Sequence, residues 1–206
     1  MQSNPVFSEK RFVYGRIVRM FHWVVGFCFI ILAVLAFSRH FFDDPVLNGH
    51  LIAYHRSFGM FTFCLVGLRL FWRLFTGEFL STVNSPMIRI VASVTHAIIY
   101  VLLIIIPILG WMEASARQNP VSVFGQDLPM PISFNLQLAE NLQIWHKHFG
   151  DWFCIIIALH VSAVIWRHFL RQDGVLYSML PLCRLRKPWS GGADYAVAKI
   201  RYENHK

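Results

Sequence analysis

The sequence predicts an all-α integral membrane protein, a four-helix bundle whose helices run up, down, up and down. Hydrophobic residues make up 56% of the chain and charged residues only 15%, a balance typical of a membrane protein. The apolar residues gather into four blocks, each close to the length of about 20 residues that a membrane-spanning helix needs. Basic residues are concentrated at alternate ends of these blocks, which predicts how the helices cross the bilayer.

The four apolar blocks define the expected helices. They cover residues 20–37, 51–72, 90–112 and 143–166. The first block contains a single strongly polar residue, His22. The third contains Pro107, which would break a solvated helix but is tolerated in a membrane span, where neighbouring helices satisfy the freed carbonyl group.

The basic residues predict the orientation. Of the 19 Lys and Arg residues, 15 fall on the side of the two termini and four on the other side. The four are Arg39, Arg56, Arg117 and Lys147. Since basic residues favour the cytoplasm, we expect both termini there. The formal net charge of +8 is then a topology signal, and no soluble basic domain is left to bind nucleic acid.

The chain divides into three expected parts. Residues 1–14 form a cytoplasmic segment, residues 15–182 the four-helix membrane domain and residues 183–206 a basic cytoplasmic tail. No cleavable signal peptide is expected, because the first twelve residues are polar and the first apolar block is long enough to span the membrane. The four cysteines are isolated and no C-x-x-C occurs, which argues against a disulfide framework or a zinc knuckle.

Four intramembrane histidines sort into two pairs by depth. His146 and His160 are 14 residues apart, which on a helix places them about 21 Å apart and only about 40° out of register. With the predicted topology, His22 and His160 lie near the cytoplasmic side, and His55 and His146 near the outer side. His148 competes with His146 but lies about 120° away from the face of His160, so we favour His146.

Two pairs of imidazoles on opposing helices predict two haem b groups stacked across the membrane, each with two nitrogen ligands. A single intramembrane histidine is more often a packing or proton-relay residue, but four at matched depths favour haem. His22, His55 and His146 are each followed four residues later by a glycine that leaves room for a flat macrocycle on the same helix face, whereas His160 is followed by Val164. The glycines are Gly26, Gly59 and Gly150. C-x-x-C-H is absent, so the haem would be bound non-covalently.

Other polar residues at the membrane surfaces have two interpretations each. His96 and His168 are expected near the cytoplasmic side, either in a quinone pocket or as interfacial polar residues. Four cations could pair with haem propionates or anchor the helices at the interface by snorkelling, and snorkelling is favoured for Arg16. They are Arg16 and Arg19 on the inner side and Arg56 and Lys147 on the outer side. The outer two would also attract a small anion such as superoxide.

Five motifs, taken in order, resemble the bacterial cytochrome b561 family from about Arg16 to Pro181, with the tail outside the resemblance. They are RMFHWVVG, AYHRSFGM, THAIIYVLLIIIPILGW, the loop NPVSVFGQDLPMP and IWHKHFGDWFCIIIALHVSAVIWRHF. The resemblance implies a four-helix bundle in the bacterial inner membrane. It also implies two haems b, ligated at His22, His55, His146 and His160, and electron exchange with ubiquinone.

Two functions stay open at this point. The protein is either a superoxide:ubiquinone oxidoreductase that needs no bound partner, or an electron-carrier subunit between quinone and a separate dehydrogenase, hydrogenase or periplasmic redox protein. The short connections expected on the outer side favour the enzyme slightly. A histidine-lined metal transporter is a third, minor possibility, because the spans hold almost no carboxylate beyond Asp151 near the surface.

Overall fold

The computed structural model describes residues 15–76, 86–171, 176 and 179. Four long helices account for most of these residues, and a short hairpin lies between the last two. The elements are α1 (Arg16–Ser38), α2 (Pro45–Thr76), α3 (Pro86–Ala116), β1 (Ser122–Val123), β2 (Gln126–Asp127), α4 (Leu136–Trp166) and a π-helical turn, η1 (Arg167–Arg171). The expected N-terminal segment and basic tail lie outside the described residues.

The prediction of four membrane-spanning helices is confirmed, because four of the described helices are long and apolar enough to cross a bilayer. Each extends beyond its apolar block, since polar ends continue the same helix. The start of α2 is one example, where Asp44 Oδ1 accepts a hydrogen bond of 2.9 Å from the Val46 amide. At the start of α4, Asn135 caps the helix by accepting from the Leu138 amide at 2.9 Å.

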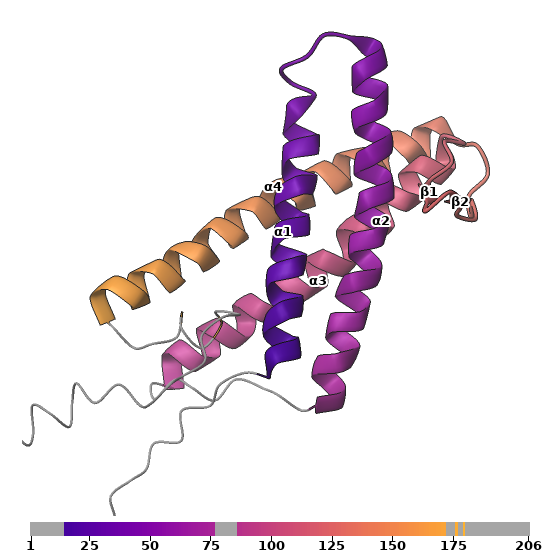
Figure 1. Cartoon of the computed structure of the whole chain (residues 1–206). Coiled ribbons are helices and arrows are strands. Elements are labelled where there is room, and N and C mark those ends of the chain that lie inside the picture. Colours follow the sequence, from indigo (N-terminus) through magenta and orange to yellow (C-terminus); the bar gives the residue numbers. More distant parts are fainter. Residues whose placement is uncertain (1–14, 77–85, 172–175, 177–178, 180–206) are drawn as a thin grey trace, which may run out of the picture.

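The helices pack as two antiparallel pairs, α1 with α2 and α3 with α4, and the pairs meet mainly along α2 and α3. Figure 1 shows that the two pairs cross at a steep inclination instead of running side by side. The connection between α1 and α2 and the hairpin between α3 and α4 belong to the same half of the molecule, which we call the hairpin end. The starts of α1 and α3 and the ends of α2 and α4 make up the opposite end.

Most large apolar side chains face outward, as expected where lipid is the solvent. Phe27 on α1 and Phe71 on α2 are each 64% exposed, and Leu159 on α4 is 65% exposed. A small buried cluster lies near the hairpin end and consists of Met60, Ala114 and Val121. Lipid-facing apolar surface and the lack of an extensive buried core both fit a bundle that packs in a bilayer.

The segment between α3 and α4 is fixed to the end of α3. The Ser115 hydroxyl donates to the Ile132 carbonyl at 3.1 Å and accepts from the Ile132 amide at 2.9 Å. The β1–β2 turn has positive φ at Phe124 (51°) and Gly125 (78°), as a two-residue type I′ hairpin requires. Phe124 packs edge-on against Phe61 of α2, with ring centroids 5.5 Å apart. The hairpin was not among the sequence predictions.

Candidate functional site

His55 on α2 and His146 on α4 face each other across the seam between the two helical pairs. Their ring centroids are 6.2 Å apart and their planes are nearly perpendicular, at 86°. Each Nδ1 atom lies at hydrogen-bond distance from a backbone carbonyl. His55 Nδ1 is 3.2 Å from the Leu32 oxygen on α1, and His146 Nδ1 is 2.9 Å from the Ile106 oxygen on α3. The structure therefore brings together the residues predicted as the outer pair.

These carbonyl contacts determine the tautomer of both rings. A carbonyl oxygen only accepts, so each Nδ1 must carry the proton and donate. In a neutral imidazole this leaves the lone pair on Nε2, which is the atom available to a metal. Carbonyl partners of this kind are the usual outer-shell groups that orient histidine ligands and raise their basicity.

Gly110 on α3 gives the His146 ring its space. A Cβ atom at this position would lie 2.9 Å from His146 Cε1 and 3.1 Å from His146 Nδ1. Any other residue at position 110 would therefore push the imidazole away from Ile106 and out of its present orientation. Gly110 belongs to the third motif but was not among the predicted site residues, because it does not follow a histidine by four residues.

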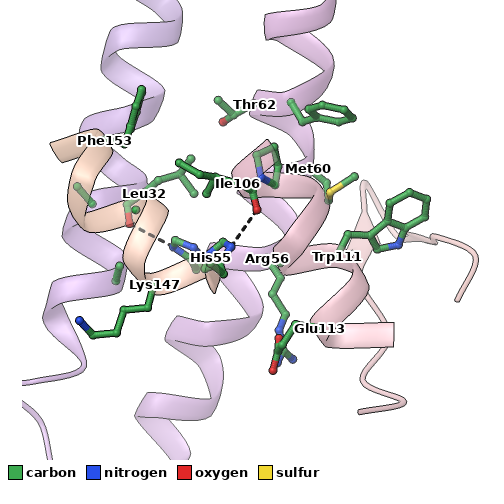
Figure 2. Close-up of a pocket in the computed structure, with 18 of the residues that line it drawn as sticks. Leu32, His55, Arg56, Met60, Thr62, Ile106, Trp111, Glu113, Lys147 and Phe153 are labelled. Carbon is green, nitrogen blue, oxygen red and sulfur yellow. Dashed lines mark hydrogen bonds and ion pairs between the residues drawn. The ribbon is translucent and has the colours of Figure 1, made fainter. Parts of the chain in front are cut away.

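A cavity of about 880 Å³ surrounds this pair and lies within the range of roughly 300–1,000 Å³ typical of small-molecule and cofactor sites. Its lining is contributed by all four helices and includes His55, Gly59, Pro107, Gly110, His146 and Gly150. Figure 2 shows His55 near the centre, Met60 and Trp111 to one side, and Arg56 beside Glu113 at the edge.

The residues present fit a haem with two axial imidazoles. Two metal–nitrogen bonds of about 2 Å and the radii of two imidazole rings separate the ring centres by about 6 Å, close to the 6.2 Å between His55 and His146. A Cβ at Gly150 would have nothing within 4 Å, and one at Gly59 would meet only Leu32 Cδ2 at 3.8 Å. Both glycines thus border open space beside the imidazoles.

Charged side chains line the hairpin end of the cavity, and three of the cations among them have carboxylate partners. Arg56 lies 3.6 Å from Glu113, Arg117 Nε donates to the other oxygen of Glu113 at 2.5 Å, and Lys147 lies 2.7 Å from Asp151. Arg56 and Lys147 were expected to hold propionates or attract an anion, and the structure adds a carboxylate partner to each. Glu113 lies one residue past the third apolar block, in the part of α3 that extends beyond it.

At the opposite end three histidines lie close together. The His96 and His160 ring centroids are 5.3 Å apart, and His22 is near enough to interact electrostatically with both. His22 Nδ1 lies 3.0 Å from Arg69 Nη2. The guanidinium of Arg69 stacks over the ring of Tyr100 at 5.5 Å, and Arg73 donates to the Tyr100 hydroxyl at 3.1 Å. His96 therefore belongs to the same cluster as His22 and His160, the residues predicted as the inner pair.

The remaining predicted residues differ in their exposure and surroundings. Arg16 is exposed, whereas Arg19 is only 9% exposed. A Cβ at Gly26 would have nothing within 4 Å. The His168 ring, in η1, packs edge-on against its neighbour Phe169. His148 is exposed and its ring contacts Trp145, whereas the ring of His146 turns toward His55.

Sequence reasoning also missed Arg69 as a site residue and counted it only as a topology signal. A usable signal was present, because Arg69 follows His55 by 14 residues. This is the spacing of His146 and His160 on α4, and it places Arg69 on the same face of α2 as His55, about 21 Å along the helix.

Comparison with known proteins places this architecture in a family. A family model described as prokaryotic cytochrome b561 matches residues 13–182. A probable superoxide oxidase CybB from Yersinia pestis is 33% identical over 97 residues, which are 47% of this chain and 55% of that protein. Cytochrome b561 homolog 2 from Escherichia coli strain K12 is 26% identical over 178 residues, which are 81% of this chain and 90% of that protein.

Proposed function

The chain belongs to the prokaryotic cytochrome b561 family, and we propose that it carries electrons across the bacterial inner membrane from superoxide to ubiquinone on two non-covalently bound haem b groups. Membership of the family makes the chain a haem-binding membrane protein of electron transport. The number of haems, the donor and the acceptor are the proposed part. So is the orientation, in which the hairpin end faces the periplasm and both termini face the cytoplasm.

One observation supports the proposal most. His55 and His146 line one cavity with their ring centroids 6.2 Å apart, and the Nδ1 atom of each ring faces a carbonyl oxygen, so that both Nε2 atoms are available as metal ligands. We assign these residues to the outer haem and His22 and His160 to the inner haem. Each haem, when bound, supplies reversible one-electron chemistry at its iron. Gly26, Gly59 and Gly150 would leave room for the macrocycles.

Superoxide as the donor is supported by charge and by one relative. The cavity lining holds four cations, Arg39, Arg56, Arg117 and Lys147, against two carboxylates, Glu113 and Asp151, so its formal charge is four minus two, or +2. Lys147 is 68% exposed and carries part of this charge to the surface. A positive mouth raises the encounter rate with small anions. One matching protein is a probable superoxide oxidase.

Ubiquinone is assigned to the opposite end, where His96 and His168 are the proposed quinone residues and Arg16 and Arg19 the proposed partners of propionates. The overall reaction would balance with two superoxide anions losing one electron each and leaving as dioxygen. One ubiquinone would gain two electrons and two protons to become ubiquinol. The protonatable imidazoles at this end can deliver protons to a quinone carbonyl.

The test begins with the purified protein. An absorption spectrum before and after dithionite, together with the ratio of haem to protein, should give two b-type haems per chain. The protein in ubiquinone-containing liposomes should then reduce quinone when superoxide is supplied, faster than spontaneous dismutation removes the anion. A preparation with one haem or none would contradict the assignment of the two pairs. Two haems that superoxide does not reduce would contradict the donor.

An electron-carrier subunit is the second candidate. It is favoured by the match to cytochrome b561 homolog 2, which extends over 90% of that protein, whereas the match to the superoxide oxidase covers 55% of that relative. A carrier would show two haems, no reduction by superoxide and co-purification with a redox protein. The superoxide assay therefore separates the two functions.

A further inference from the structure

Glu113 joins three helices over one edge of the cavity. Its two carboxylate oxygens contact Arg56 on α2 and Arg117 at the end of α3. Arg117 also donates from Nη2 to Gln143 Oε1 on α4 at 2.8 Å. All four residues line the cavity, and Figure 2 shows Arg56 and Glu113 side by side at its edge. We call this group the rim cluster.

The rim cluster is only partly buried. The side chains of Arg56 and Arg117 are 22% and 27% exposed, and that of Glu113 is 13% exposed. Two guanidinium groups share one carboxylate, so the cluster keeps one formal positive charge. Because solvent reaches it, an incoming anion can feel this remaining charge without displacing Glu113 from either arginine.

We propose that Glu113 sets how strongly the donor site attracts a small anion, by limiting the positive charge of the rim cluster to one. This rests on the proposed function, because it names the residue that tunes the entry of the donor. Without the carboxylate the two arginines would present a double charge and attract the anion more strongly. Without Arg117 the cluster would be neutral and would give no attraction.

The test uses two substitutions of opposite sign and one matched control. Glu113→Gln raises the charge of the rim cluster by one with almost no change in shape. Arg117→Gln lowers the charge by one and also shortens the side chain that donates to Glu113 and Gln143. Asp127→Asn raises the net charge by the same amount at the same end of the molecule, but Asp127 lies on β2 and does not line the cavity. Haem reduction is followed by stopped-flow absorption in the purified, haem-loaded protein.

Two anionic reductants serve as probes, namely superoxide and dithionite, which reacts through its sulfur dioxide radical anion. Glu113→Gln should raise the second-order rate with both, roughly threefold for a unit charge about 6 Å from the anion's path in water, and Arg117→Gln should lower it by a similar factor. Asp127→Asn should change it far less. The differences should fade as salt is added, because screening shortens the reach of the charge.

Rates that move in the same direction in Glu113→Gln and Arg117→Gln would overturn the proposal, as would an equal effect of Asp127→Asn. If Glu113→Gln fails to bind haem, Arg117→Gln still tests whether the charge of the rim cluster sets the rate of haem reduction. The test is whether its rate falls and whether the difference from wild type fades with added salt. A wild-type protein that superoxide does not reduce would contradict the proposed donor alone. The dithionite rates would still test the role of Glu113, so the two failures can be distinguished.

Discussion

The guanidinium of Arg69 lies 3.0 Å from Nδ1 of His22. Arginine donates and never accepts, so Nδ1 of His22 must accept, and in the neutral ring the proton then sits on Nε2. His96 has the opposite arrangement, with Nδ1 2.5 Å from the Ala92 carbonyl of its own helix and Nε2 left without the proton. His55 and His146 resemble His96, because the Nδ1 atom of each also faces a carbonyl oxygen. Haem loss in variants of His22 and His96 therefore decides which of the two is the partner of His160.

We predict that His22→Ala loses one of two haems while His96→Ala keeps both. If His22 is a ligand through Nε2, its Nδ1 must carry the proton and can no longer accept from Arg69. In this assignment the Arg69 guanidinium therefore moves away from Nδ1 when the haem binds. The haem-to-protein ratio and the reduced-minus-oxidised spectrum measure the outcome. The reverse result, with haem lost in His96→Ala and kept in His22→Ala, would make His96 and His160 the inner pair. It would also remove His96 from the quinone site.

Gly110→Ala should disturb the binding of the outer haem by displacing the ring of His146. The new methyl group would lie 2.9 Å from His146 Cε1, so the ring must rotate and give up its hydrogen bond to Ile106. We expect most of one haem to be lost, or the electron paramagnetic resonance signal of one low-spin centre to change. Gly67→Ala is the matched control, because a Cβ there meets nothing within 4 Å. Identical spectra for the two variants would refute the positioning role of Gly110.

Gly150→Leu should exclude the outer haem by filling the space beside His146. A Cβ at position 150 meets nothing within 4 Å, so the larger side chain is compatible with the helices themselves. Gly49→Leu places the same side chain at another open helical glycine that does not line the cavity. Haem content should fall to one per chain in the first variant and stay at two in the second. Full content in Gly150→Leu would show that the macrocycle lies elsewhere.

Ser115→Ala should destabilise the hairpin end. The Ser115 side chain, in a residue that is 1% exposed, exchanges hydrogen bonds with the amide and carbonyl of Ile132. Its loss removes the acceptor of the half-buried Ile132 amide, whereas the Ile132 carbonyl still accepts from Gln118 Nε2 at 3.0 Å. The free energy of unfolding should therefore fall by about 0.5–1.5 kcal/mol. Ser38→Ala is the control, because its hydroxyl bonds to Val34 within one helix. The two melting temperatures in detergent provide the comparison.

Reporter fusions test the orientation. A green fluorescent protein joined to the C-terminus should fluoresce in the cytoplasm, and alkaline phosphatase inserted within residues 39–44 should be active in the periplasm. Both expectations follow from the excess of basic residues on the side of the termini. An active phosphatase at the C-terminus would invert the topology and would place the rim cluster in the cytoplasm, away from periplasmic superoxide.

The helices could be predicted because their signal is local. About twenty apolar residues in sequence leave few alternatives to a membrane span, and what hydropathy failed to mark in the four helices is their extensions beyond the apolar blocks. The pairing of His55 with His146 could be expected from depth, since α-helical rise converts residue number into height. This is why the 14-residue spacing was informative.

The side-chain partners of these histidines could not be predicted in the same way. The carbonyl groups of Leu32 and Ile106 belong to α1 and α3, the antiparallel neighbours of the helices that carry His55 and His146. These contacts depend on how the two helices within each pair are rotated and staggered against each other, and sequence spacing along one helix carries no information about that. Glu113 was missed for a related reason, because the apolar block stops one residue before it although the helix continues. Of its two arginine partners, Arg117 follows it by four residues at the end of the same helix, whereas Arg56 comes from α2 and adjoins it only in the folded chain.

The crossing of the two helical pairs has a consequence for biogenesis. The helices pack mainly within each antiparallel pair, whereas His55 and His146 belong to different pairs. A prosthetic group ligated by both residues would link the two helical pairs. In a cell short of haem, newly made chains would then be inserted into the membrane with their two helical pairs not yet linked. Membrane proteases can remove such chains before they accumulate.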